Sequence, residues 1–257
     1  MECIQSANWM CRNDLKYKMI TIKNIKALWI ILLMMWIPPS FSVVCHPKIN
    51  PHLPQYVIGY GSLIDEQSKK RTDPSAQENL PVRVNGYKRS WSVHGNLPGF
   101  NATFLSVYED SKSAFNGVIY KLSNPENIKH YDKRERAYCR KALTVDKLQI
   151  LTSTLPEQKQ IWIYTSAQKN NQYPVKNYPI VQAYVDTFIR GCLRIEEKFK
   201  IKNFAKDCIK NTDQWSVFWI NDRIFPRHPS AIEPDAAKID GLLKEMVPEQ
   251  FKYIKIE

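Results

Sequence analysis

A turn with two glycines is the first part of this sequence that has the means to do chemistry. It lies within residues 56–65, where Val57 and Tyr60 favour a buried strand and Gly59 and Gly61 allow the backbone to turn sharply. Backbone N–H groups around such a turn are able to converge on an anion. The turn is therefore a candidate cradle for a carboxylate or a developing oxyanion. The ordinary alternative is a strand that simply ends in a glycine turn.

The second candidate is a charged segment in which Asp132 and Glu135 lie three positions apart. Residues at that spacing share one face of a helix, and Arg134, Arg136 and Arg140 are close in the sequence. The segment therefore presents carboxylates beside arginines, which is a second candidate for chemistry. The ordinary alternative is a solvated helix face on which both carboxylates pair with arginines.

The rest of the sequence lacks the familiar catalytic patterns. Ser62 does not stand in G-x-S-x-G, and the five histidines show no metal-binding spacing. The glycine pair lacks the third glycine of a dinucleotide-binding fingerprint, and no Walker A lysine follows it. No C-x-x-C occurs, so structural zinc and thioredoxin chemistry are not indicated. The sequence predicts neither a metal nor a cofactor.

The elements that must position these groups are mainly strands in the first half of the chain. Besides the strand that enters the glycine turn, the composition predicts strands at 82–93, 102–108, 117–122 and 160–165. Residues 96–99, which include a proline, supply a turn between the first two. Residues 138–151 are also expected to be extended.

Helical patterns dominate the second half. One helix is expected earlier, from Ser123 or Asn124 to about Arg136, because Pro125 suits the first helical position. Apolar spacing predicts later helices at 180–195, 199–209 and 236–246, and a final strand at 251–256. Gly191 weakens the first of these helices near its end. Strands first and helices later favour an α+β fold.

In this order, the two candidate stretches resemble the γ-glutamylcyclotransferase superfamily. Its members carry a Y-G-S-[NL] turn after the first strand and, later, a D-x-x-E segment that is often followed by an aromatic residue and an arginine. The turn here matches the form G-Y-G-S-L-I, and residues 117–120 are similar to the G-V-V-Y strand before the helix. Tyr138 and Arg140 complete the second motif, and Tyr184 and Gly191 fall where members have a late helix. The resemblance covers about residues 55–200.

The resemblance implies a small mixed β-barrel with helices packed outside and a pocket at one barrel mouth. It makes Glu135 the catalytic general acid and base of an enzyme that needs no cofactor. The substrate would be a γ-glutamyl peptide or amine, with glutathione as one candidate, and the products would be 5-oxoproline and a free amine. The implied substrate-binding residues are Gly59, Tyr60, Gly61, Ser62, Leu63 and Tyr184.

Two other functions remain open at this point. The same fold is able to serve as a binding module that holds a γ-glutamyl ligand without turning it over. Alternatively, the protein interacts with other macromolecules through its basic surface and its C-terminal aromatic residues. Those aromatic residues are Trp215, Phe218, Trp219 and Phe225.

The N-terminal 42 residues are interpreted as an extension plus a secretory signal peptide, with one domain and a C-terminal helical extension over 43–257. Lysines precede an apolar run at 27–37, and small residues follow at 40–42. The run is shorter than the roughly 20 apolar residues that cross a bilayer. The protein is therefore expected to be exported, periplasmic or secreted, without stable membrane insertion after cleavage. An uncleaved anchor is the alternative, and Met19 is a second possible start.

The remaining chain is basic and carries four cysteines. The net charge of the whole sequence is +12 at pH 7, and removal of residues 1–42, with five Lys/Arg and two Asp/Glu, leaves +9. This excess favours anionic small molecules or an anionic surface, and the ordinary alternative is a solvated basic surface. No nucleic-acid-binding module is recognisable, so no nucleic-acid partner is predicted. Cys192 and Cys208 are able to pair in an oxidising compartment, but the spacing of these two with Cys45 and Cys139 leaves the connectivity open. The oligomeric state is equally open.

Overall fold

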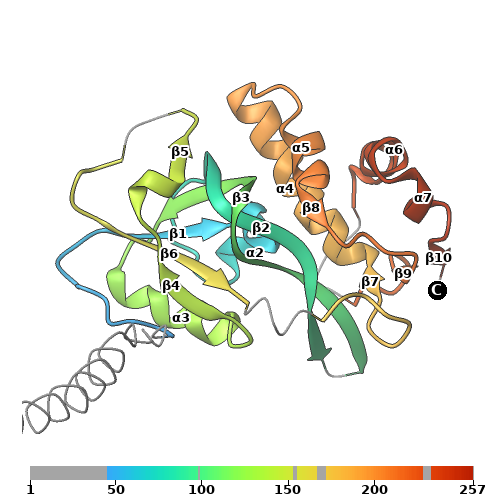
Figure 1. The fold of residues 1–257 in the computed structure, drawn as a ribbon, viewed down its shortest axis with the longest axis horizontal. Coiled ribbons are helices and arrows are strands. Elements are labelled where there is room, and N and C mark those ends of the chain that lie inside the picture. Colours follow the sequence, from blue (N-terminus) through green and yellow to red (C-terminus); the bar gives the residue numbers. More distant parts are fainter. Residues whose placement is uncertain (1–44, 98, 153–154, 167–171, 228–232, 257) are drawn as a thin grey trace, which may run out of the picture. The chain divides into compact units, whose positions relative to one another are not determined.

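Strand β1 (Gln55–Gly59) lies inside the main sheet and leads directly into the glycine turn. The structure is a computed structural model that describes residues 45–97, 99–152, 155–166, 172–227 and 233–256. These residues belong to one unit, Val44–Glu257 (Figure 1). The expected signal peptide, residues 1–42, lies outside the described residues. No helix within the described ranges is long and apolar enough to cross a membrane.

The main sheet is mixed and open. Its seven strands follow the order β4–β6–β1–β3–β2–β5, and β8 (Thr212–Asp213) pairs with β2. The other strands are β2 (Leu80–Leu97), β3 (Phe100–Lys121), β4 (Cys139–Ala142), β5 (Leu148–Ile150) and β6 (Gln160–Thr165). A barrel closes only if its end strands pair. Here β4 and β5 are short and stand at opposite ends of the order, without pairing in the described chain. The α+β class is confirmed, and the expected barrel is corrected to an open sheet.

Strands β2 and β3 form one long antiparallel hairpin, coloured green in Figure 1. The two strands expected at 102–108 and 117–122 are therefore parts of β3. The polar residues between them bulge out opposite Gly86, which has a φ of +78°. Asp110 accepts hydrogen bonds from the Lys112 amide at 3.0 Å and the Ser113 hydroxyl at 2.8 Å. The bulge thus satisfies its own polar groups, and the strand continues past it.

The helix that carries the charged segment is shorter than expected. A 3-10 turn, η2 (Pro125–Asn127), capped by Asn124, precedes α3 (Ile128–Arg134). Glu135 stands outside the helix with φ −93° and ψ 32°. Its amide still donates to the Tyr131 carbonyl at 2.8 Å, but the chain then turns toward β4. Asp132 and Glu135 consequently do not share one helical face.

Helix α4 (Gln182–Phe199) is longer than expected and passes straight through Gly191. A Cβ atom at Gly191 would lie 2.7 Å from the Asp65 amide nitrogen, so the glycine lets the helix approach the end of the turn closely. Arg190 adds an ion pair of 2.9 Å to Asp65. Gly191 therefore serves packing rather than weakening the helix. Lys200 and Asn203 both have positive φ, which ends α4 and delays α5 (Phe204–Lys210).

The remaining elements complete the fold around this frame. The short helices are η1 (Ser62–Ile64), α2 (Glu66–Lys70), η3 (Val145–Lys147), α6 (Ala236–Met246) and α7 (Pro248–Phe251). A second sheet has the order β10–β9–β7, formed by Lys255–Ile256, Trp219–Asn221 and Ile180–Val181. The strand expected at 160–165 and the helix expected at 236–246 are confirmed with the same bounds as β6 and α6.

The core lies on both faces of the main sheet. Val57 of β1 belongs to a cluster with α4, α5 and α6, and the next residue, Ile58, belongs to a separate cluster with Val82, Phe115 and Ile163. Both faces of β1 are therefore covered, which explains its unbroken run of buried residues. Disulfides join Cys192 to Cys208 and Cys45 to Cys139. The pairing of Cys192 with Cys208 agrees with the pair considered from the sequence.

The C-terminal aromatic residues divide between core and surface. Trp219 is buried, and Trp215 packs between it and Trp91, with ring centroids 5.2 Å from each. Phe218 and Phe225 are exposed. The tryptophans are therefore ordinary core residues, and only the two phenylalanines remain available for an interaction surface.

Candidate functional site

The glycine turn forms a tight connection between β1 and α2. The Ile64 amide donates to the Gly61 carbonyl at 3.0 Å, and the Asp65 side chain caps α2 by accepting from the Ser68 amide at 2.8 Å. A Cβ atom at Gly59 would lie 3.0 Å from the Leu63 carbonyl carbon. The turn therefore folds back on itself too closely for a side chain at this position.

Tyr184 lies on α4, much later in the chain, and its side chain reaches the same turn. A Cβ atom at Gly61 would lie 2.6 Å from the Tyr184 hydroxyl, so only glycine leaves room for this contact. Burial raises the pKa of Tyr184 to about 12, against a lowering effect of hydrogen bonds from the backbone and side chain of Ser62. The phenol is therefore protonated at neutral pH. Because Tyr184 and Gly191 lie seven residues apart, both face the turn from one side of the helix.

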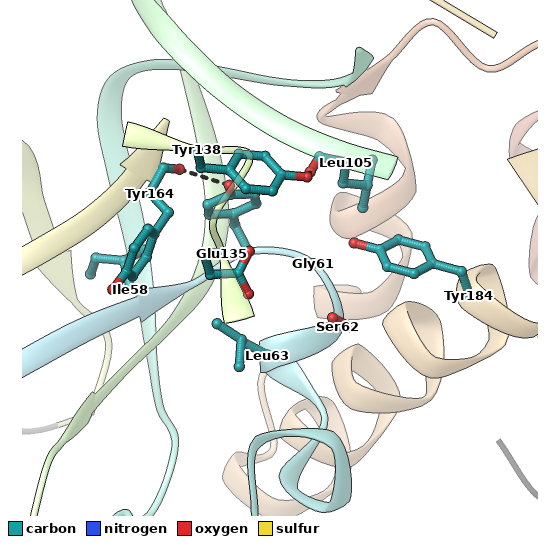
Figure 2. Close-up of a pocket in the computed structure, with 10 residues that line it drawn as sticks. Ile58, Gly61, Ser62, Leu63, Leu105, Glu135, Tyr138, Tyr164 and Tyr184 are labelled. Carbon is teal, nitrogen blue, oxygen red and sulfur yellow. Dashed lines mark hydrogen bonds between the residues drawn. The ribbon is translucent and has the colours of Figure 1, made fainter. Parts of the chain in front are cut away.

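Glu135 projects toward the turn from the connection after α3 (Figure 2). The Tyr138 amide donates to the Glu135 carbonyl at 2.8 Å, which fixes the backbone on the far side of the residue. The side chain is 16% exposed and pairs with Arg134, whose Nε lies 3.1 Å from Oε1. Burial raises the pKa of Glu135, while the charge and hydrogen bond of Arg134 oppose that rise. The carboxyl group is thus suited to exchange protons nearer neutrality than an exposed glutamate.

Arg134 joins Glu135 to the turn and to α2. Its Nη2 donates to the Ser62 hydroxyl at 2.9 Å and to the Ser68 hydroxyl at 3.0 Å. Its Nη1 donates to the Ser68 carbonyl at 2.8 Å and to the Thr72 hydroxyl at 2.6 Å. The guanidinium therefore holds the carboxylate and the serine of the turn in one network.

Four tyrosines surround the Glu135 carboxylate: Tyr60, Tyr138, Tyr164 and Tyr184. The negative charge of Glu135 contributes to the raised pKa of each. Burial is the larger cause for all of them. Tyr60 donates to the Tyr164 carbonyl at 2.7 Å, and Tyr138 donates to the Leu105 carbonyl at 2.9 Å. These bonds fix the Tyr60 and Tyr138 rings, and because the pKa of each of the four phenols is raised, the tyrosines around Glu135 are uncharged at neutral pH.

Asp132 does not line the pocket, although it contacts one of its tyrosines. It accepts from Arg140 Nε at 2.8 Å and from the Tyr164 hydroxyl at 2.7 Å. Both carboxylates of the charged segment therefore pair with arginines, as the ordinary alternative predicted. Only Glu135 also lines a pocket, and this separates the two residues.

The cavity volume of this pocket is about 30 Å³. Of the predicted site residues, Tyr60, Gly61, Ser62, Leu63, Tyr184 and Glu135 line it. Gly59 shapes the turn but does not line the pocket. A wider groove of about 450 Å³ shares Ser62, Glu135 and Tyr184 with it. No group of three His, Cys, Asp or Glu side chains in the described ranges is placed to hold a metal ion.

Four lining residues were not among the predicted site residues: Ile58, Leu105, Tyr138 and Tyr164. Tyr138 had a signal in the sequence, because it belongs to the second motif. Tyr164 lies in a strand that was predicted correctly, but its place in the site depends on the pairing of β6 with β1. That pairing joins residues about a hundred positions apart, which local patterns do not reveal.

Comparisons with known proteins give structural likenesses only. No family model matches the chain, and no curated protein matches it. A gamma-glutamyl cyclotransferase is similar in fold, with a TM-score of 0.49 and 12% identity, over 75% of this chain and 99% of that one. A yeast gamma-glutamyl cyclotransferase specific to glutathione has a TM-score of 0.36 and 11% identity, over 60% and 96%. An AIG2-like protein from Mus musculus has a TM-score of 0.32 and 21% identity, over 46% and 83%.

Proposed function

We propose that the protein is a γ-glutamylcyclotransferase-type enzyme that converts the γ-glutamyl group of a peptide or amine to 5-oxoproline and releases the amine. The observation that carries the proposal is the position of Glu135. This acid, whose pKa is raised, faces the glycine turn inside a pocket with four tyrosine walls. The two sequence motifs of the superfamily thus meet at one place in the fold.

Glu135 would act first as a base and then as an acid. As a carboxylate, it accepts a proton from the α-ammonium group of the substrate, and the free amine attacks the γ-carbonyl carbon. The new C–N bond closes a five-membered ring and leaves negative charge on the carbonyl oxygen. When this oxyanion collapses, the bond to the leaving nitrogen breaks, and Glu135 returns the proton to that nitrogen. Attack also leaves a second proton on the ring nitrogen, and this proton passes to the released amine, which departs as an ammonium ion. Protons, charge and electron pairs then balance between substrate, products and enzyme.

The turn would bind the negative charge of the substrate. Gly61 and Leu63 line the pocket, so their N–H groups are the proposed donors to the substrate carboxylate or to the oxyanion. The Ser62 hydroxyl, held by Arg134, stands beside them. The folded glutamyl group would occupy the pocket together with the adjoining groove, and holding it in attack geometry would supply part of the rate enhancement through orientation alone.

Glutathione is the first substrate to test. The wide groove next to the pocket offers space for the remainder of a γ-glutamyl peptide beyond the glutamyl group. Shorter γ-glutamyl dipeptides and γ-glutamyl amines are the other members of the proposed substrate class.

Release of 5-oxoproline by the purified protein is the deciding experiment. Glutathione, γ-glutamyl dipeptides and γ-glutamyl amines are offered to the parent, to Glu135→Gln and to Asp132→Asn as a matched carboxylate control. The proposal predicts release by the parent and by Asp132→Asn, and none by Glu135→Gln. Circular dichroism confirms that each variant is folded. Ligand binding by the parent without 5-oxoproline release would instead establish the binding-module alternative.

We also propose that the protein is exported through its N-terminal segment. The two disulfides support this, since disulfides persist mainly in oxidising compartments. Fractionation of cells that express the full chain, with N-terminal sequencing of the product, tests it. A mature N-terminus near residue 43 is expected, and an intact, membrane-bound chain would indicate the uncleaved anchor.

A further inference from the structure

Arg89 is a fully buried arginine whose hydrogen-bond acceptors are all neutral. Its Nε donates to the Thr212 hydroxyl at 2.7 Å. Its Nη1 donates to the carbonyls of Tyr60 at 3.2 Å and Asn116 at 2.7 Å. Its Nη2 donates to the Asn116 side-chain oxygen at 3.2 Å and to the Cys208 carbonyl at 2.7 Å. Every N–H group is thus used, and none of these acceptors is a carboxylate.

A buried charge without an opposite charge is costly, which makes this arrangement unlike an ordinary core contact. Burial lowers the pKa of Arg89 to about 9, so the guanidinium still carries its charge at neutral pH. The rings of Phe188 and Phe115 lie 4.9 and 5.5 Å from its central carbon. The positive charge of Arg89 is therefore stabilised by the neutral oxygens that accept its N–H groups and by the two aromatic rings.

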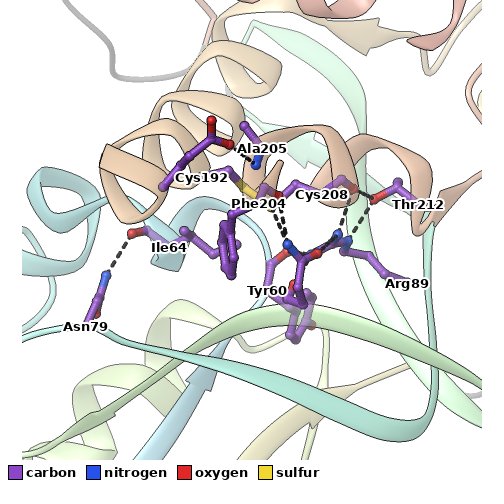
Figure 3. The surroundings of a disulfide bond; sticks show 11 residues. Tyr60, Ile64, Asn79, Arg89, Cys192, Phe204, Ala205, Cys208 and Thr212 are labelled. Atoms are coloured by element: carbon purple, nitrogen blue, oxygen red, sulfur yellow. Dashed lines mark hydrogen bonds between the residues drawn. A yellow bond between two sulfur atoms is a disulfide. The ribbon is translucent and has the colours of Figure 1, made fainter. Parts of the chain in front are cut away.

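One of those carbonyls belongs to the glycine turn (Figure 3). The Tyr60 carbonyl and the Gly61 N–H are the two ends of one peptide unit. A charged donor on the carbonyl oxygen polarises that unit and makes its N–H a stronger donor, because hydrogen bonds in a chain reinforce one another. Gly61 lines the pocket, so the effect reaches the place where a substrate anion would bind.

The other hydrogen-bond acceptors fix the position of the Arg89 guanidinium relative to the turn. Asn116 lies on β3, Cys208 on α5, and Thr212 on β8. The Asn116 side chain donates to the Phe204 carbonyl at 2.8 Å, and a disulfide ties Cys208 to α4. Three elements thus hold the guanidinium, and the guanidinium holds the Tyr60 carbonyl.

We infer that Arg89 is a positioning residue of the active site, which orients the Tyr60–Gly61 peptide and strengthens the Gly61 N–H as a donor to the substrate carboxylate. This inference rests on the proposed function, because it assigns the bound anion to a γ-glutamyl substrate. The carboxylate survives in the product 5-oxoproline, so binding of the product reports on the same contact without turnover. Loss of the hydrogen bond from Arg89 to the Tyr60 carbonyl weakens binding of the substrate in its ground state. It leaves the proton transfers of Glu135 in place.

The test compares Arg89→Lys with Arg223→Lys in the purified protein. Arg223 also makes several hydrogen bonds, to Asp186 and Asp240, but lies outside the pocket lining, so it controls for the loss of a structural arginine. For Arg89→Lys we expect KM for the γ-glutamyl substrate and Kd for 5-oxoproline to rise about tenfold, as for one charge-assisted hydrogen bond. The value of kcat stays nearly constant. Arg223→Lys changes none of the three.

Several outcomes overturn the inference. A folded Arg89→Lys with unchanged KM and Kd does so, as does an equal effect from Arg223→Lys. If Arg89→Lys does not fold, NMR of the parent decides, because 5-oxoproline must shift the Gly61 amide proton downfield, and no shift refutes the role. A parent that binds 5-oxoproline with this shift but releases none from any substrate contradicts the enzyme proposal alone.

Discussion

The Tyr184 hydroxyl and Gly61 occupy adjoining space, so that any Cβ atom at Gly61 would lie 2.6 Å from the phenolic oxygen. The contact joins α4 to the turn directly beside Glu135. It is the reason that a glycine, rather than any small residue, is required in the middle of the turn.

Gly61→Ala is expected to displace either Tyr184 or the turn and to reduce kcat/KM at least tenfold, about 1.4 kcal/mol of transition-state stabilisation. Gly241→Ala is the matched control. Gly241 lies in α6 with nothing within 4 Å of an added Cβ atom, so alanine there should stabilise the helix by about 1 kcal/mol. Steady-state kinetics and thermal unfolding of both variants check the prediction. Full activity in Gly61→Ala would contradict the role of this contact.

The pH dependence of activity should report Glu135. The base must be ionised to accept the substrate proton, and its pKa is raised above the ordinary value of 4.5. Activity should therefore fall as pH decreases through an acidic limb whose midpoint lies above 4.5. A profile of kcat/KM measures the midpoint for the free enzyme. A midpoint at or below 4.5 would mean that a different group is the base.

Stability should depend on the same group with a defined sign. In the native state Glu135 holds its proton to higher pH than in the unfolded state, because its folded pKa is the higher one. Stability therefore falls as pH rises from 4.5 through the folded pKa. Glu135→Gln cannot ionise, so its stability relative to the parent should increase over that window. Urea unfolding at a series of pH values tests this, and a constant difference would disprove it.

Arg134 should determine the midpoint of the acidic limb in the pH profile of kcat/KM. Its charge and hydrogen bond lower the pKa of Glu135 against burial, so Arg134→Gln is expected to move the midpoint to higher pH. It also loses the hydrogen bond to Ser62, which should raise KM. Lys133→Gln, an exposed neighbour, removes the same charge from the segment without either contact. A shift of equal size in both variants would show that the effect is one of general charge.

The Cys192–Cys208 disulfide should stabilise the fold measurably. It closes a loop with a sequence separation of 16, for which chain entropy predicts about 3 kcal/mol. The double variant Cys192→Ser/Cys208→Ser is expected to lose that much in unfolding free energy and to retain Cys45–Cys139. Denaturant curves with and without a reducing agent measure it. An unchanged denaturation midpoint in the double variant would show that the disulfide adds little to the free energy of unfolding.

Local signals in the sequence were sufficient for the parts of the site that lie within short segments. The glycine turn and the strand at 160–165 follow from residue types and their immediate neighbours. Glu135 and Tyr184 were singled out by the family resemblance, and both line the pocket, while their roles stay predictions. The α+β class follows from the order of strand and helix patterns along the chain.

Features that depend on contacts between distant residues were not predictable in this way. The polar residues after Glu109 gave the pattern of a break, but their bulge satisfies its own hydrogen bonds opposite Gly86, and β3 continues. A glycine at position 191 is the pattern of a weak point in a helix, although the close approach of Asp65 requires it. The open sheet likewise depends on which edge strands meet, and no single segment encodes that.

The pairing of β1 with β6 has a consequence for how the protein matures. Val57 lies opposite Trp162 in a parallel pair, so the central sheet is complete only after a long intervening chain has been placed. Contacts of such high sequence separation slow folding, because loop closure must precede the gain from packing. Tyr184 lies still later in the chain, so the proposed site also needs this segment to be in place. A nascent or truncated chain that ends before α4 therefore lacks the Tyr184 side of the proposed site, and under the proposed function the appearance of activity would be a late reporter of complete folding.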